Sequence, residues 1–142
     1  MIGDLYINGK DCWFEWGVSM GNGFLDAIDS FVPTKAFIEN ESRAEDGKRV
    51  LVVAPRVASR DLTLHFTICG ENEYDFRYKK NAFEQELRSG MLEVVVPSLG
   101  YSVYRLIYTG KNVTYRMSKA RNFCAFSAKF EEPNPADRAK RA

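Results

Sequence analysis

The sequence predicts a mainly β protein of the α+β class, built as an antiparallel β-sandwich or partly closed barrel with one flanking α-helix. Apolar and polar residues alternate strictly over the eight residues 61–68 of a predicted strand at 60–69, the pattern of a strand with one face on a core. A clear helical spacing of apolar residues covers 71–88. The chain is 13% aromatic, with 10 Phe and 7 Tyr, and aromatic residues suit pleated surfaces. No alternation of strands with helices is present, so a parallel sheet is not expected.

The length of 142 residues fits one domain. We expect that domain to span residues 1–132. The sequence after Glu132 contains two prolines and no apolar pattern. Residues 133–142 are therefore predicted to form a polar, flexible C-terminal tail.

The N-terminal elements are expected to be short. Residues 4–7 predict a strand, and Asn8-Gly9 predicts a tight turn after it. A second apolar stretch covers residues 12–18 and includes Trp13 and Trp16. Residues 24–31 carry apolar side chains at helical spacing and predict a short helix that ends before Pro33.

Two strand-like runs, residues 35–40 and 48–53, flank the polar segment 41–47 and predict a hairpin with a charged tip. A two-stranded ribbon is not stable alone in water, so it must pack on its own core or on a neighbouring chain. The sequence leaves these two alternatives open. If a neighbour is the partner, the candidate subunit interface consists of the apolar residues of both runs: Phe37, Ile38, Val50, Leu51, Val52 and Val53.

The second half of the chain predicts most of the sheet. The strand 60–69 is followed by the helix 71–88, and Gly90 stands where the helix would end. Further strands are expected at 92–96, 101–108, 113–117 and 123–130, with a turn at 110–112 between the second and third of them. The predicted core-facing residues of the two clearest strands are Leu62, Leu64, Phe66, Ile68, Cys124, Phe126, Ala128 and Phe130.

No catalytic, cofactor-binding or metal site is predicted. The single histidine, His65, falls on the polar face of the strand 60–69, where a surface role is expected. Asp26 and Asp29 could share one face of a short helix, but a solvated surface is the expected reading for them as well. The sequence contains no GxSxG, HExxH or phosphate-loop motif. We therefore predict that the chain is not an enzyme and needs no cofactor.

Charge and cysteine content exclude several other classes. Twenty basic and 19 acidic residues give a formal net charge of +1, so no field is available to attract nucleic acid. Three widely spaced cysteines with one histidine fit neither a zinc site nor a disulfide framework. There is no signal-peptide pattern and no long apolar run, so no membrane association is expected. We expect the chain to stay in the cytoplasm of the cell that makes it.

The stretch from Arg60 to Pro135 resembles a known pattern. The strand RDLTLHFTICG leads into the helix YKKNAFEQELRSG, the strand MLEVVVPSLG, the paired strands YSVYRLIYTG and KNVTYRM, and the closing KFEEPNP. This order is similar to the N-terminal domain of phage distal tail proteins and, more broadly, to the tail-tube fold. The opening DLYINGKDCWFEWGV also resembles the start of prophage tail components.

The resemblance implies a β-sandwich with one helix that forms a ring, commonly a hexamer, in the virion tail. Its implied partners are copies of itself and other tail proteins, and the host cytoplasm is its place before assembly. Typical distal tail proteins carry a second domain, so the exact tail role stays open. The alternative reading is a small-molecule or lipid-binding β-barrel module, in which the aromatic strands would line a cavity.

Overall fold

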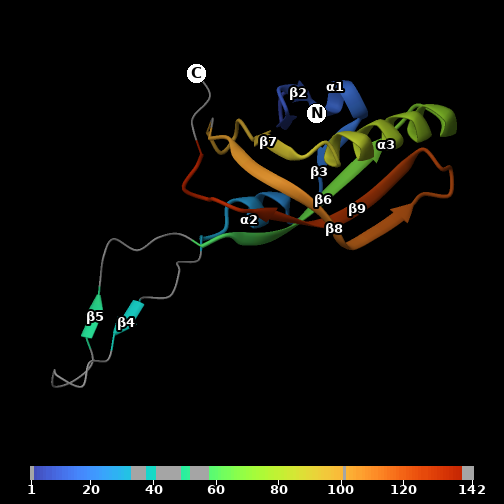
Figure 1. Ribbon diagram of the computed structural model, residues 1–142. Coiled ribbons are helices and arrows are strands. Elements are labelled where there is room, and N and C mark those ends of the chain that lie inside the picture. The colour runs from blue at the N-terminus through green and yellow to red at the C-terminus, as the bar shows by residue number, and fades with distance from the viewer. Residues whose placement is uncertain (1, 33–37, 41–48, 52–57, 101, 139–142) are drawn as a thin grey trace.

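The computed structural model describes residues 2–32, 38–40, 49–51, 58–100 and 102–138 (Figure 1). Seven strands form one antiparallel sheet in the order β2-β1-β7-β8-β9-β6-β3, and the sheet does not close into a barrel. The prediction of a mainly β, sandwich-like α+β fold is confirmed. The strands of this sheet are β1 (Tyr6–Ile7), β2 (Lys10–Asp11), β3 (Val18–Met20), β6 (Arg60–Cys69), β7 (Met91–Val95), β8 (Tyr104–Met117) and β9 (Phe123–Glu132).

Three helices accompany the sheet: α1 (Cys12–Trp16), α2 (Phe24–Ile28) and α3 (Glu73–Leu87). A separate two-stranded sheet is formed by β4 (Ile38–Asn40) and β5 (Arg49–Leu51). Figure 1 shows this pair standing apart from the seven-stranded sheet, on the side opposite α3.

The core is centred on the ring of Phe66 in β6. Its ring centroid lies 5.3 Å from that of Phe24 in α2 and 5.4 Å from that of Phe83 in α3. The rings of Phe126 and Phe130 in β9 lie 5.5 and 5.9 Å away. The Phe66 side chain therefore connects α2 and α3 to β6 and β9, the two strands of the sheet that pair over ten residues.

Helix α1 lies in the apolar stretch 12–18, for which the sequence predicted no helix. Asp11 starts the helix, because one oxygen of its carboxylate accepts hydrogen bonds from the backbone N–H of Trp13 at 3.0 Å and of Phe14 at 3.3 Å. Its other oxygen accepts a bond from the N–H of Gly3 at 2.8 Å. Gly17 ends the helix in the left-handed conformation, with φ of 63°. A Cβ at Gly17 would lie 2.1 Å from the carbonyl oxygen of Cys69, so no larger residue fits there without displacing backbone.

Replacing Asp11 by alanine is expected to lower the free energy of unfolding by about 1 kcal/mol, the usual value of a lost N-cap. Urea denaturation followed by circular dichroism measures this loss. The matched control is Glu15→Ala, which removes an equal charge from the first turn of the same helix without removing a cap. An equal loss in both variants would contradict the capping role of Asp11.

Helix α3 confirms the predicted helix and shortens it by two residues at the start and one at the end. The side chain of Asn72 accepts a hydrogen bond from the N–H of Asp75 at 2.8 Å, and the Asp75 carboxylate accepts one from the N–H of Glu71 at 2.9 Å. Phe76, Phe83 and Leu87 form its buried stripe.

The turn predicted at residues 110–112 is not a hairpin turn. Gly110 and Asn112 do have the positive φ angles, 69° and 51°, that suggested one. In the structure they produce two register shifts against β9, and β8 continues through them as one strand of 14 residues. The distal half of β8 therefore extends well beyond its pairing with β7, which covers only Tyr104 to Ile107.

Candidate assembly surface

Within the described residues, the two predicted strands of the hairpin pair with each other as β4 and β5. Ile38 lies opposite Leu51, and Val50 lies opposite Glu39, in an antiparallel register. Phe37, Val52 and Val53 of the candidate interface lie outside the described residues. We call residues 33–57, from which β4 and β5 come, the ribbon segment.

Arg60, the first residue of β6, joins the described chain that precedes the ribbon segment to the described chain that follows it. Its guanidinium donates hydrogen bonds to the carbonyl oxygen of Ile28 at 2.7 Å and to that of Ser30 at 2.9 Å. Both carbonyls belong to the chain just before the ribbon segment, whereas Arg60 lies just after it. Arg60 also donates to the carboxylate of Glu132 at 2.5 Å, and both side chains are buried. Arg60 thus connects the described chain on either side of the ribbon segment to Glu132 at the end of β9.

A second arginine completes this cluster. Arg138 donates from Nε and Nη2 to the two oxygens of Glu132, at 2.8 and 2.7 Å, and its guanidinium lies 4.7 Å from the ring centroid of Tyr104. Burial acts to raise the pKa of Glu132, but the hydrogen bonds and charges of Arg138 and Arg60 outweigh it and lower the pKa below its ordinary 4.5. Pro135, which lies between Glu132 and Arg138 in the sequence, is buried. Residues 133–138 therefore contact the rest of the domain at Glu132 and Tyr104, next to Arg60.

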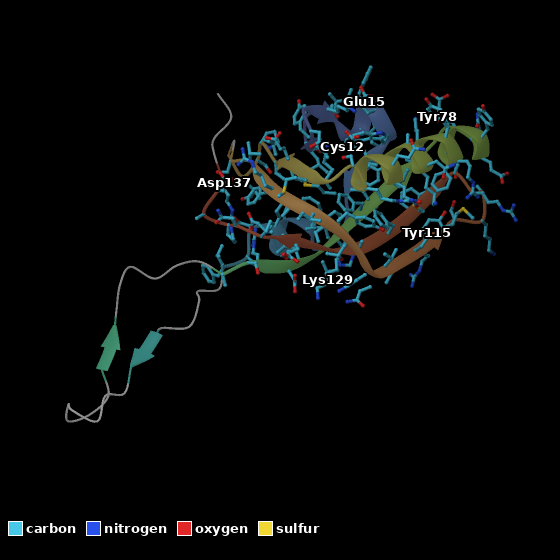
Figure 2. All side chains as sticks on the ribbon, viewed as in Figure 1. Cys12, Glu15, Tyr78, Tyr115, Lys129 and Asp137 are labelled. Carbon is cyan, nitrogen blue, oxygen red and sulfur yellow. The ribbon has the colours of Figure 1, made fainter. Side chains whose placement is uncertain are left out.

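A groove lies at the opposite end of β6, between α3 and the distal half of β8. It has a volume of about 240 Å³ and is open to solvent on one side. This is below the roughly 300–1,000 Å³ of typical small-molecule pockets. Its apolar walls include Phe83 and Leu87 of α3, Val113 and Tyr115 of β8, and Cys124 and Phe126 of β9. Figure 2 shows Tyr115 on β8 at the end of the molecule where α3 lies.

The titratable residues considered as site candidates from the sequence lie at the surface. His65 is exposed on the outer face of β6, as predicted, Asp26 is exposed on α2, and Asp29 is exposed at the C-cap just after α2. No group of three or more metal-ligating side chains occurs among the described residues, and every buried side-chain nitrogen or oxygen in them has a hydrogen-bond partner. None of their helices is long and apolar enough to cross a membrane.

The cysteine thiols of the described part are unpaired. Cys12 and Cys124 are buried, and Cys69 is half-buried. Burial is the largest cause that raises the pKa of both Cys12 and Cys124, which keeps these thiols protonated and unreactive at neutral pH.

Comparison with known proteins finds a likeness in fold alone. No protein-family model matches the sequence, and no curated protein matches it. Among solved structures, the Dit protein (gp 19.1) of phage SPP1 superposes with a TM-score of 0.57 and 14% sequence identity. In fold, this chain resembles Dit. The likeness covers 93% of this chain and 50% of the Dit chain, so this chain spans about half the length of Dit.

Dit is described as a paradigm of the hub adsorption apparatus of phages that infect Gram-positive bacteria. The resemblance to phage tail proteins read from the sequence is therefore supported at the level of the fold.

The sequence analysis did not predict the Arg60–Glu132–Arg138 cluster, although the sequence contains a signal for part of it. Arg60 is in phase with Leu62 and Leu64, and Glu132 is in phase with Ala128 and Phe130, so the alternation alone places both charges on the core face.

Proposed function

We propose that this chain is a structural subunit of a phage tail that assembles with copies of itself, through the ribbon segment, into a closed ring. Its other partners are neighbouring proteins of the tail, and it carries out no catalysis. The observation that carries the proposal is the separate β4–β5 sheet on a domain whose fold resembles Dit. A two-stranded sheet of this size needs a partner surface to be stable in water.

The sequence of the ribbon segment supports a protein partner. Residues 50–53 read Val-Leu-Val-Val, four consecutive residues of which three are β-branched. Such a run is costly to expose and favours pairing with another chain. The hydrogen bonds of Arg60 hold together the described chain on either side of the segment.

The solution mass tests this proposal. Light scattering across a concentration series is expected to show a closed oligomer, with six copies as the first expectation from the resemblance. The double variant Ile38→Lys/Leu51→Lys, which changes two residues that lie opposite each other in the register, is expected to lower the mass toward the monomer. The control is Glu15→Lys/Asp26→Lys, two exposed residues of α1 and α2. An unchanged oligomer after deletion of residues 35–53 would show that the hairpin does not join the subunits.

A further inference from the structure

The distal half of β8 has one edge with no strand partner among the described residues. From Lys111 to Met117, β9 is its sole strand partner within the part of the chain that the structure describes. The two register shifts occur before Thr114, and the ladder from Thr114 to Met117 is regular. One row of backbone hydrogen-bonding groups therefore faces outward from Thr114 to Met117, along about 10 Å of strand.

This open edge borders the groove under α3. Val113 and Tyr115 line the groove and remain 46% and 44% exposed, which is unusual for apolar side chains in mid-strand. The Nζ atom of Lys80 lies 5.3 Å from the ring centroid of Tyr115 and marks the outer wall. A strand added to the edge would place alternate side chains in the groove, because successive residues of a strand point to opposite faces.

Charge at this edge is positive. Residues 111–122 contain Lys111, Arg116, Lys119 and Arg121 and no acidic residue. Arg121 forms an ion pair with Glu73 at 3.5 Å, but Lys111, Arg116 and Lys119 form none within the described residues. On α3, Glu84 forms ion pairs with Lys80 and with Arg88. Arg77 of the same helix forms no ion pair within the described residues.

The tip of the ribbon segment has the complementary charge, although the segment as a whole is not acidic and Lys48 and Arg49 directly follow the tip. This tip, residues 41–47, contains Glu41, Glu45 and Asp46 against Arg43. The described pair β4–β5 lies beyond the Arg60 end of β6 (Figure 1). The groove, which Ile68 lines, lies at the Cys69 end. A donor and an acceptor at opposite ends of one molecule produce a head-to-tail contact, which can close into a ring.

We propose that the distal β8 edge and the adjacent groove are the acceptor site for the ribbon segment of a second copy of this chain. The ribbon adds to the open edge of β8 by strand pairing, its apolar residues enter the groove, and its acidic tip lies along Lys111 and Arg116. This inference rests on the proposed self-assembly and adds the surface that receives the ribbon segment.

Photo-cross-linking tests the acceptor site directly. The variant Val113→p-benzoylphenylalanine is prepared as a mixture of unlabelled and ¹⁵N-labelled chains, irradiated, digested and analysed by mass spectrometry. Mixed-isotope cross-links between position 113 and residues 37–53 are expected. Met91→p-benzoylphenylalanine is the matched control, because Met91 is also a strand residue and is 48% exposed. It is expected to give no cross-links to residues 37–53.

Charge reversal gives a second readout. Lys111→Glu/Arg116→Glu and Glu45→Lys/Asp46→Lys are each expected to lower the mass of the assembly, and combining all four changes is expected to restore it. Three results would overturn the acceptor site: cross-links from position 113 within one chain only, cross-links to other segments, or no cross-links at all. An oligomer observed together with such a failure would overturn this inference and leave the proposed function standing. A monomer at every concentration would overturn both.

Discussion

Replacing Phe66 by alanine is expected to lower the free energy of unfolding by about 3–5 kcal/mol, the typical loss for a buried phenylalanine. The ring is 2% exposed and has four aromatic neighbours, from α2, α3 and β9. Because those neighbours come from separate elements, the surrounding structure cannot collapse easily into the space left. Urea denaturation followed by circular dichroism measures the change, which is a large part of the stability of an ordinary domain.

The control for this variant is Phe14→Ala. Phe14 is 74% exposed on α1, so its loss is expected to change the free energy of unfolding by no more than about 0.5 kcal/mol. A similar cost at both positions would mean that Phe66 does not centre the core.

Replacing Glu132 by alanine is expected to cost about 3–5 kcal/mol, because the change leaves the buried Arg60 without its counter-charge. Arg138 loses its two hydrogen bonds in the same variant. The control is Glu131→Ala, a half-buried neighbour whose side chain points to the other face of β9. Equal losses in the two variants would contradict the special role of Glu132.

The same carboxylate gives the protein a pH dependence. Its pKa is lowered in the folded state, so its contribution to the free energy of unfolding is fully present above its ordinary pKa of 4.5 and is lost as the pH falls through the lower folded value. Denaturation curves in this acidic range are expected to show wild-type stability falling toward that of Glu132→Ala. A constant difference between the two proteins down to the lowest pH would contradict the lowered pKa.

Sequence patterns predicted the strands best where both faces of a strand have different chemistry. The strand 60–69 was predicted with its observed bounds, since eight residues alternate without a break. Helix α1 was missed because Trp, Phe and Cys have modest helix propensity, and the cap at Asp11 provides what those residues lack. The continuity of β8 was missed because Gly110 and Asn112 give the same local signal in a bulge as in a turn.

The candidate surfaces differ in how far local sequence can reveal them. The hairpin is visible from its two strand-like runs and the Asp46-Gly47 pair between them. The groove is not visible, because it depends on where α3 packs relative to Tyr115 and Cys124, residues far apart in the chain. The open edge of β8 depends on the difference in length between β7 and β8, which the misread turn concealed.

The attachment of the ribbon segment to Arg60 has a mechanical consequence. A pull on the segment acts first on the bonds from Arg60 to Ile28, Ser30 and Glu132, and then along the axis of β6. All ten residues of β6 pair with β9, so a force along the strand loads the whole ladder in shear instead of opening it one pair at a time. The domain is therefore stiff along the axis of β6, and tension that enters at Arg60 is spread over β6 and β9.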